Sequence, residues 1–484
     1  MLLTHEGKVF VIAQNEQLNP TQINMPDNGY TDYEALGQSA SFKDRNLNLS
    51  FFRYNDIKFV DYNQVKKLYI STTFYDKNRS CYGTRVYAAD VPNTVTNASR
   101  LSLNASDWKI IYESKPCLPL SEKTSTIEGE MSGGRLAFQA PNNLYLANGD
   151  YHLDGIHRQS TYGVAPDSDY SKLIRINTDD YAHEVVVKGL RNPQGITLDD
   201  SGKIWVVDHG VRGGDELNLI KPGADYGWPY VSLGTMYNLQ PIPGLKQQGR
   251  DEGFEQPIYA WLPSVGISSL MTIHDFDPTW DGDLLAGSMS SPDFGRRLFR
   301  IRIVGERLEF VENIRIGQRI RYLSPFGKNK IAVWLDTHEL VIFTKVARPN
   351  YMQQLQERAK QQLGEPLSGQ LLDVIAQCSE CHSFEKNLHN AGPSLNEVLG
   401  RNVASTSYQG YSDALKQYGG RWTEQRLKAF IRDPKNSVAG TTMPETGLQD
   451  EKVLNAMIWA LNELNTMENT HYRYDQIKDT VTFH

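Results

Sequence analysis

The residues with the most specific chemistry in this chain are Cys378, Cys381 and His382, which form the pattern Cys-x-x-Cys-His. Two thiols at this spacing can form thioether bonds to the vinyl groups of a porphyrin, while the adjacent imidazole binds the iron. A zinc site would need a second Cys/His pair nearby, and a redox-active cysteine pair would need a surrounding βαβ pattern. The sequence shows neither of these. We therefore predict that haem c is attached here and that electrons pass through it.

Three further segments follow the haem motif in a characteristic order: Asn390–Leu395 with a Gly-Pro pair, Gly440–Pro444 with Met443, and a helix-like run over 450–464. This order resembles class I cytochrome c over residues 366–467. The resemblance implies a small all-α domain in which the Gly-Pro segment lies against His382. It also implies that Met443 is the sixth ligand, so that His382 and Met443 hold the haem iron.

Composition limits the partners of the chain. The net charge is −7, and the 50 Lys and Arg residues form no basic block, which argues against a nucleic-acid partner. No apolar run approaches the ~20 residues that a membrane-spanning helix needs, and the first residues do not form a signal-peptide core. Because c-type haem is normally attached outside the cytoplasmic membrane, we expect a periplasmic or other extracytoplasmic location. We therefore infer an export signal or lipid anchor that this numbering does not contain.

The chain upstream of residue 346 shows repeated pairs of strand-like runs joined by polar turns. The pairs are Val65–Phe74 with Arg85–Ala89, Asn143–Asn148 with Lys172–Asn177, Lys203–Asp208 with Glu216–Lys221, Asp283–Ser288 with Arg297–Ile303, and Lys330–Leu335 with Glu339–Thr344. A four-stranded propeller blade needs ~40–50 residues, so this length would hold about six blades. We predict a mainly β fold, with a six-bladed β-propeller over residues 1–345. A pair of β-sandwiches is the alternative that periodicity does not exclude.

Three smaller features complete the organisation. Residues 346–365 are rich in Gln and charged side chains, which predicts a surface helix acting as a linker between the domains. The polar tail over 468–484 is expected to pack on a neighbouring domain or to fray. Cys81 and Cys117 either form a disulfide, which an oxidising compartment would permit, or are two unrelated buried thiols.

The centre of the first domain carries its most specific motifs. They are R-N-P-Q-G over 191–195, H-G-V-R-G-G-D-E-L-N over 209–218 and Y-G-W-P over 226–229. In this order they strongly resemble the soluble quinoprotein glucose/sorbosone dehydrogenases and aldose sugar dehydrogenases. Gly133-Gly134-Arg135-Leu136 and Gln318-Arg319-Ile320-Arg321 extend the resemblance upstream and downstream. The family uses a six-bladed propeller with pyrroloquinoline quinone (PQQ) and calcium.

The resemblance implies a set of residues for a quinone with three carboxylates. Arg191, Arg319 and Arg321 would hold carboxylates and polarise carbonyl oxygens, because guanidinium groups are permanently charged and donate in a planar fork. Asn192 would hydrogen-bond the edge of the quinone. Arg191 is also the expected catalytic arginine.

The resemblance also implies two calcium sites. The carbonyls of Gly210 and Val211 match the positions that bind the catalytic ion, while Glu216 and Tyr226 match a structural site. Calcium accepts oxygen ligands in flexible geometry and can act as a Lewis acid. Taken singly, each motif also has a purely structural interpretation: a blade turn, a solvated acidic pair, or two arginines on alternate positions of a surface strand.

One position departs from the family pattern. Two residues before the G-G-R-L motif the family has a histidine that takes the proton of the sugar hydroxyl, and this chain has Met131 there. A thioether does not accept a proton, and loss of a positioned base costs ~10²–10⁴ in rate. Glu130 is the neighbouring candidate for a catalytic base. On an extended strand adjacent side chains point to opposite faces, so Glu130 can replace the base only from a bulge or a loop.

These observations support two hypotheses. The first is a periplasmic quinohaemoprotein dehydrogenase that oxidises a sugar or alcohol with PQQ and calcium and passes electrons singly to its own haem, then to a downstream redox protein. The second is an electron-transfer cytochrome whose propeller has lost catalysis and serves as a binding or docking module. A propeller that uses its arginines to hold a different polycarboxylate is a third possibility. The chemistry around Met131 distinguishes the first from the second.

Overall fold

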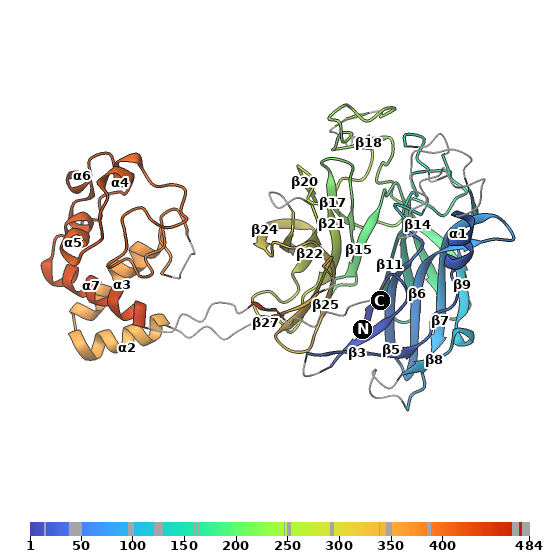
Figure 1. Ribbon diagram of the computed structural model, residues 1–484, viewed down its shortest axis with the longest axis horizontal. Coiled ribbons are helices and arrows are strands. Elements are labelled where there is room, and N and C mark those ends of the chain that lie inside the picture. The colour runs from blue at the N-terminus through green and yellow to red at the C-terminus, as the bar shows by residue number, and fades with distance from the viewer. Residues whose placement is uncertain are drawn as a thin grey trace. The chain divides into compact units, whose positions relative to one another are not determined.

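The computed structural model describes residues 1–13, 16–37, 51–94, 101–120, 129–157, 161–162, 164–245, 247–248, 253–290, 295–337, 339–344, 351–384, 389–466 and 474–476. The chain divides into two compact units, one comprising Met1–Thr344 with Tyr474–His484 and the other Lys345–Arg473. The first unit is built of strands and the second of helices (Figure 1).

Strands of the first unit pair into six sheets of three or more strands within the described residues. The first two sheets are β1 (Leu2–Leu3), β2 (Val9–Ile12) and β3 (Leu18–Pro20), and β5 (Tyr54–Tyr62), β6 (Val65–Asp76), β7 (Cys81–Asp90) and β10 (Leu118–Pro119), with β9 (Lys109–Glu113) also paired to β7. The third and fourth are β11 (Gly133–Gln139), β12 (Asn143–Asn148), β13 (Lys172–Asn177) and β14 (His183–Lys188), and β15 (Pro193–Leu198), β16 (Ile204–Asp208), β17 (Asp215–Leu219) and β20 (Tyr259–Trp261).

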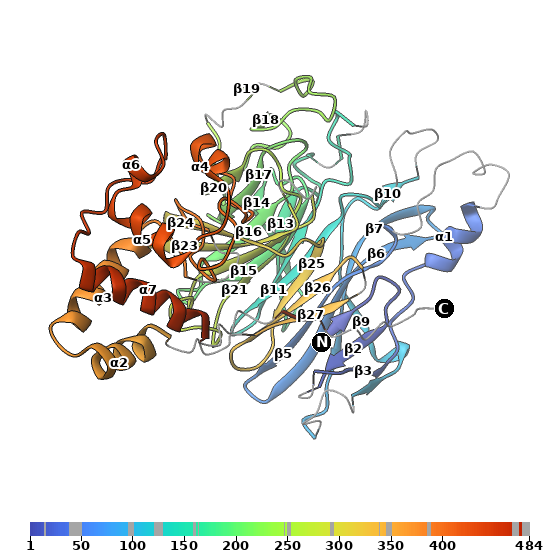
Figure 2. The same cartoon turned by 60° about the vertical axis from the view of Figure 1, so that its left-hand side comes forward.

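The last two sheets are β21 (Ile267–Thr272), β22 (Leu284–Ser288), β23 (Arg297–Val304) and β24 (Arg307–Arg315), and β25 (Ile320–Pro325), β26 (Lys330–Leu335), β27 (Leu340–Thr344) and β28 (Tyr474–Gln476). Two short parallel pairs, β4 (Gln22–Ile23) with β8 (Ser102–Leu103) and β18 (Val231–Ser232) with β19 (Gln247–Gln248), lie outside these sheets, as does α1 (Tyr30–Gly37). Consecutive sheets follow one another around the unit in chain order (Figure 2).

Apolar side chains between neighbouring sheets close the structure into a ring. Leu146 and Ile174 of the third sheet pack against Tyr69 and Val86 of the second, and equivalent layers join each later pair of sheets. The circle is completed where Leu2 of the first sheet packs among apolar residues of β26 and β27, including Ala332, Leu340 and Ile342. The unit is therefore a six-bladed β-propeller, as the sequence predicts, and the alternative pair of sandwiches is wrong.

Local pairings also agree with the sequence. All five predicted pairs of runs form neighbouring antiparallel strands, namely β6 with β7, β12 with β13, β16 with β17, β22 with β23 and β26 with β27. The structure also decides between the two alternatives for Cys81 and Cys117, because it joins them in a disulfide between β7 and the segment leading to β10.

The innermost strands β5, β11, β15, β21 and β25 share one irregularity. Each has a β-bulge at its start, where one extra residue is inserted into the pairing with the next strand; these residues are Asn55, Gly134, Gln194, Ser268 and Arg321. A bulge re-aims side chains and increases the local twist. The repeated bulge therefore gives each of these five blades one residue that is free from the ladder.

The second unit consists of α2 (Tyr351–Leu363), α3 (Leu367–Ser379), α4 (Asp413–Tyr418), α5 (Glu424–Arg432), α6 (Pro434–Ser437) and α7 (Glu451–Thr466). Its core joins Leu371 and Ile375 of α3 to Leu454 and Ile458 of α7. Thr423 caps α5 by accepting a hydrogen bond from the backbone N–H of Arg426, 3.2 Å away. This unit matches the small all-α domain that the sequence predicts.

The linker prediction is wrong in one respect. Within residues 346–365 the structure forms α2, but Leu355 and Ala359, one turn apart on this helix, are fully buried in the core of the helical unit. The helix is therefore part of that unit and not a spacer, because its few apolar residues lie on one face despite its polar composition. Of the tail over 468–484, only β28 is described, and it adds to the outer edge of β27.

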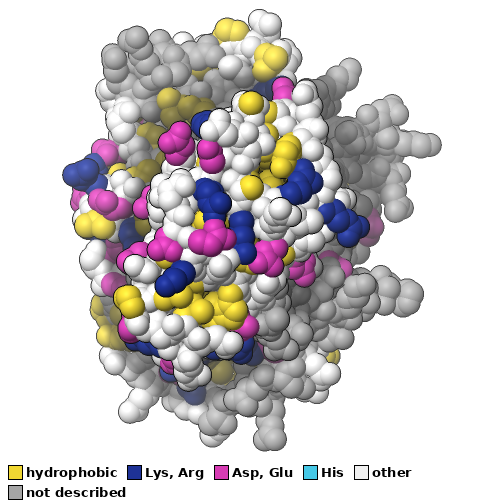
Figure 3. Space-filling view, turned by 90° about the vertical axis from the view of Figure 1, so that its left-hand side faces the viewer, with side chains coloured by type: hydrophobic (Ala, Val, Ile, Leu, Met, Phe, Trp, Pro, Cys, Tyr) yellow, Lys and Arg dark blue, Asp and Glu magenta, His cyan; other side chains and the backbone are white. Residues whose placement is uncertain are grey.

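None of the described helices is long and apolar enough to cross a membrane. Lys/Arg and Asp/Glu side chains are interspersed on the face of the molecule shown in Figure 3.

Candidate functional site

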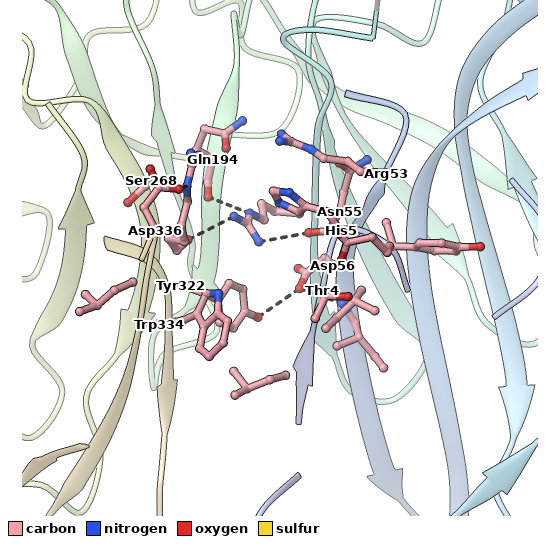
Figure 4. Close-up of a pocket in the computed structure, with 18 of the residues that line it drawn as sticks. Thr4, His5, Arg53, Asn55, Asp56, Gln194, Ser268, Tyr322, Trp334 and Asp336 are labelled. Atoms are coloured by element: carbon pink, nitrogen blue, oxygen red, sulfur yellow. Dashed lines mark hydrogen bonds and ion pairs between the residues drawn. The ribbon is translucent and has the colours of Figure 1, made fainter. Parts of the chain in front are cut away.

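A polar cavity of about 110 Å³ lies where the innermost strands meet (Figure 4). The bulge residues Asn55, Gln194, Ser268 and Arg321 line it, together with the turn that follows β1 and other residues of the inner strands. The bulges thus decide which side chains face the cavity.

Arg135, from the G-G-R-L motif, joins several blades at this cavity. Its guanidinium donates to the backbone carbonyls of Gln194 at 3.0 Å, Asn55 at 3.2 Å and Arg321 at 3.4 Å. All three acceptors belong to bulge residues on other blades. Because these bonds use most of its N–H groups, Arg135 has mainly a structural role, tying four inner strands together.

Arginines and carboxylates balance each other around the cavity. Arg53, Arg135 and Arg321 line it, and so do Glu6, Asp56 and Asp336. Burial, with Arg135 and Arg321, lowers the pKa of Arg53 to about 10. Burial, with these three arginines, lowers the pKa of His5 to about 3, so His5 is neutral at ordinary pH.

Arg319 and Arg321 are brought together by one carboxylate. Their Nε atoms donate to the two oxygens of Asp336, at 2.7 Å and 2.6 Å respectively. Burial alone would raise the pKa of Asp336, but the two arginines hold it below its ordinary value. Both guanidinium groups thus keep other N–H donors, although part of their charge is already neutralised.

Arg191 is buried and is the best candidate for an anion ligand in the propeller. Its Nη1 donates to the carbonyls of His209 at 2.7 Å and Gly210 at 2.9 Å, and its guanidinium lies over the ring of Trp228. Its Nε and Nη2 are buried and have no hydrogen-bond partner among the described residues. Buried donors of this kind normally find an acceptor, so a carboxylate-bearing ligand fits them well.

Asn192 lies beside Arg191 and is held by the same carboxylate. Asp208 accepts the backbone N–H groups of Arg191 and Asn192, each at 2.7 Å, and burial raises the pKa of Asp208 to about 6. The side-chain oxygen of Asn192 accepts a hydrogen bond from Gln194 at 2.7 Å. Asn192 therefore links Arg191 to the bulge residue of its own strand.

The predicted catalytic calcium position is shaped by Asp215. This fully buried carboxylate accepts hydrogen bonds from the backbone N–H of Gly210, from two groups of the loop after β20 and from the N–H of Ile267 at the start of β21. The Gly210 carbonyl accepts from Arg191, so a calcium ion there would share this oxygen with the guanidinium. Val211 is buried against Trp228. Calcium binding at Gly210 and Val211 stays a prediction.

Glu216 and Tyr226, the predicted structural calcium pair, have other partners in the fold. The Tyr226 hydroxyl donates to the carbonyl of Leu219 at 2.5 Å and accepts from the N–H of Lys221 at 3.1 Å, and burial raises its pKa to about 12. Glu216 accepts a hydrogen bond from Asn218 at 3.2 Å. The Tyr226 hydroxyl thus has a structural role that explains its burial without a metal ion.

Glu130 lies in a turn and not on a regular strand, which is what a replacement for the missing base requires. Residues 129–131 form a turn before β11, and Met131 has a left-handed backbone with φ 57°. Glu130 therefore does not alternate with Met131 as it would on a strand. Its Oε2 lies 3.2 Å from Nε2 of His152, on the loop after β12.

Glu130 and His152 shift each other's pKa, and Arg191 shifts the pKa of both. Burial would raise the pKa of Glu130, but the hydrogen bond and charge of His152, with Arg191, lower it. Burial and Arg191 lower the pKa of His152, outweighing the opposite effect of Glu130. At neutral pH the pair is therefore a carboxylate beside a neutral imidazole.

The sequence interpretation missed His152 and its neighbours. Asp150 accepts a hydrogen bond from Nε1 of Trp228 at 2.7 Å, and burial and the nearby Asp154 raise its pKa to about 7. His157 pairs with Asp154 at 2.7 Å. A loop with the order Asp-x-His-x-Asp-x-x-His directly after a buried strand was the available signal.

The haem motif lies at the end of α3 in the helical unit. The backbone N–H groups of Cys381 and His382 both bond to the carbonyl of Cys378, so one helical turn carries all three side chains. The two cysteines form no disulfide and are half-buried. Nδ1 of His382 lies 2.7 Å from the carbonyl of Pro393, which fixes the ring and leaves Nε2 for the iron.

His382 and Met443, the two predicted iron ligands, have surroundings that suit this role. Burial lowers the pKa of His382, although its hydrogen bond to Pro393 opposes this, so the imidazole is neutral and can act as a ligand. Met443 is half-buried and packs against the apolar core of the unit. Two unpaired thiols, an oriented imidazole and a thioether are the donor set that a covalently attached haem requires.

Comparison with known proteins agrees with both units. Residues 56–341 match the Glucose / Sorbosone dehydrogenase family. The uncharacterized protein slr1608 of Synechocystis sp. is 32% identical over 290 residues, covering 54% of this chain and 66% of the relative. The aldose sugar dehydrogenase YliI of Escherichia coli is 30% identical over 249 residues, covering 47% and 62% respectively. The chain thus spans just under two thirds of these two relatives.

The helical unit has separate relatives. The cytochrome c2 of Blastochloris viridis is 38% identical over 93 residues, which cover 19% of this chain and 73% of that protein. A solved structure called glucose dehydrogenase has the propeller fold with a TM-score of 0.53 at 24% identity, covering 71% of this chain and 91% of that chain. The chain therefore belongs to the glucose/sorbosone dehydrogenase family, and its C-terminal region belongs to the cytochrome c family, which implies haem c.

Proposed function

We propose that this protein is an extracytoplasmic quinohaemoprotein dehydrogenase that oxidises a sugar or an alcohol and delivers the electrons to its own haem c. The observation that carries the proposal is the pair of unpartnered, buried N–H groups of Arg191 close enough to the Glu130–His152 pair to lower the pKa of both groups. A permanent cation with free donors next to a proton acceptor is what oxidation of an alcohol on an anionic cofactor needs. The relative YliI is named an aldose sugar dehydrogenase, which supports the choice of substrate class.

Each residue has a separate task in this proposal. Arg191 would hold a carboxylate or carbonyl oxygen of PQQ through Nε and Nη2, with Asn192 at its edge and Arg319 and Arg321 as further anion ligands. Bound PQQ would supply a quinone that accepts a hydride from the substrate carbon. Glu130 would take the hydroxyl proton at Oε1, because its Oε2 is engaged by His152.

The two electrons have to leave one at a time, since haem iron changes by one electron. His382 and Met443 would hold this iron, and Cys378 and Cys381 would attach the porphyrin. Haem c supplies a one-electron acceptor, and a soluble or membrane-bound redox protein would oxidise it in turn. Calcium at Gly210 and Val211, and at Glu216 and Tyr226, is part of the prediction but no step depends on it.

The test is reconstitution of the full-length haem protein with PQQ, with and without calcium, while the Soret and α bands are recorded during addition of aldoses and alcohols. Substrate-driven haem reduction that requires PQQ supports the proposal. The Arg191→Lys variant should lose reduction, because Lys offers no planar fork at Nε and Nη2. Met131→Leu is the matched control, since neither thioether nor alkyl group accepts a proton, and it should keep the wild-type rate.

A degenerate propeller is the second candidate, and the substitution at Met131 favours it. In that case PQQ would neither bind nor mediate haem reduction by any aldose or alcohol, while chemical reductants would still reduce the haem. This outcome would leave an electron-transfer cytochrome with a docking module.

A further inference from the structure

The loop between β12 and β13 carries three side chains of metal-ligating type that the proposed dehydrogenase chemistry does not use as ligands. They are His152, Asp154 and His157. One possible ligand atom from each lies within 4.8 Å of the others. The Asp154 side chain is fully buried, and His152 is 6% exposed, so the group belongs to the interior and not to a solvated acidic surface.

His152 is already oriented by a carboxylate, because its Nε2 lies 3.2 Å from Glu130. A histidine that binds a metal almost always donates its second ring nitrogen to a carboxylate or carbonyl. Nδ1 of His157 lies 2.7 Å from one oxygen of Asp154, so these two possible ligand atoms are already adjacent. The other oxygen of Asp154 accepts two backbone N–H groups of the same loop, which holds the carboxylate in place.

Nδ1 of His152 provides independent evidence for a ligand. With Nε2 engaged by Glu130, Nδ1 is buried and has no hydrogen-bond partner among the described residues. A buried ring nitrogen without a partner is unfavourable, because water no longer satisfies it. A metal ion bound to this nitrogen would remove the cost.

Carboxylates surround the loop. Asp154 belongs to the group itself, and Glu130 lies against His152. Asp150 uses its two oxygens for the indole N–H of Trp228 and the backbone N–H of His152, so it orients the loop without being needed as a ligand.

We propose that His152, Asp154 and His157 bind a divalent transition-metal ion of the zinc class, with Glu130 fixing the ring of His152. Imidazole ligands distinguish this site from calcium and magnesium sites, which use oxygen. Zinc bonds of ~2.0–2.1 Å place tetrahedral ligand atoms about 3.3 Å apart. The three side chains therefore need to close by at most about 1.5 Å, which side-chain rotation provides.

The experiment uses the full-length, haem-loaded protein, because free thiols of a haem-free form would also bind zinc. After treatment with chelator, the protein is equilibrated with Zn²⁺, and bound zinc is counted per haem iron by elemental analysis. The wild type should retain one equivalent, and a tenfold excess of Ca²⁺ should not displace it. His157→Ala should lose this equivalent, and Glu130→Gln should weaken the affinity about 10–100-fold.

The control is His183→Ala, which removes an exposed histidine at the start of β14 and should leave zinc binding unchanged. His157→Gln provides a second variant of similar size in case the alanine variant does not fold, and a zinc-dependent rise in melting temperature is measured for each. The proposal is overturned if the wild type binds no zinc, if Ca²⁺ displaces it, or if His183→Ala loses as much as the His157 variants. None of these readouts depends on dehydrogenase activity.

Discussion

Gly392 gives the sharpest test of the haem environment. A Cβ on this residue would lie 2.5 Å from Cε1 and 2.7 Å from Nδ1 of His382. Carbon atoms in contact normally lie about 3.5–4.0 Å apart, so Gly392→Ala must push the imidazole away by about 1 Å. The displaced ring would also weaken the 2.7 Å hydrogen bond from Nδ1 to the Pro393 carbonyl.

The expected cost is the sum of two effects. Overpacking costs about 1–3 kcal/mol, and a lost hydrogen bond about 0.5–1.5 kcal/mol, so the helical unit should lose about 1.5–4.5 kcal/mol of stability. Chemical denaturation followed by haem absorbance measures this loss, and haem content and midpoint potential report on the iron ligand directly. Backbone strain does not enter, because Gly392 is not among the glycines with positive φ.

Gly369→Ala in α3 is the matched control. A Cβ there meets only the flexible end of Glu365 at 3.3 Å, and Gly→Ala in a helix stabilises by about 0.5–1 kcal/mol. The reasoning would be refuted if Gly392→Ala matched Gly369→Ala in stability, haem content and midpoint potential. That result would mean that the ring of His382 does not lie against this glycine.

Three further outcomes are expected. Glu130→Gln should lower the rate of PQQ-dependent haem reduction by ~10²–10⁴, and Met131→His should restore part of it in the double variant; an unchanged rate in the single variant would exclude Glu130 as the base. Replacing Cys81 and Cys117 by serine opens a loop of 36 residues and should destabilise the propeller by about 4 kcal/mol in urea denaturation, whereas an unchanged midpoint would contradict the disulfide. Burial opposes the ionisation of Asp336, but its arginine partners lower its pKa in the folded state. The ionised carboxylate therefore stabilises the fold at any pH above the pKa that Asp336 has in the unfolded chain. This stabilisation is lost as the pH falls through the lower pKa of the folded state. The difference in denaturation midpoint between wild type and Asp336→Asn should therefore shrink between pH 5 and the acid limit, and a constant difference would refute the linkage.

Much of the fold could be predicted from local patterns. Alternating side chains and polar turns identified five strand pairs correctly, because each pair is formed by neighbours in sequence. The haem segment was equally accessible, since a porphyrin dictates the spacing of Cys378, Cys381 and His382. Closure of the ring by Leu2 against β27 depends on contacts more than 300 residues apart, which periodicity does not reveal.

The contacts around Met131 could not be predicted from the sequence. Family order drew attention to Met131 and Glu130, but His152 lies on a different loop and becomes relevant only because it meets Glu130 in space. Likewise, nothing in the sequence shows that the Gly210 carbonyl accepts from Arg191. The polar composition of α2 indicated a linker. Its two buried residues, Leu355 and Ala359, nevertheless anchor the helix in the core of the helical unit.

The five bulges have a consequence for how such a propeller can change. Each bulge residue is outside the regular ladder, while the apolar layers between blades are formed by other positions. Chemistry at the axis can therefore be altered one blade at a time, with little cost to the interfaces that keep the ring closed. Gly134 is the exception among the five, because a side chain there would meet Asn55 at 2.6 Å. The bulge residue can therefore be substituted in four of these blades, whereas a side chain at Gly134 would clash.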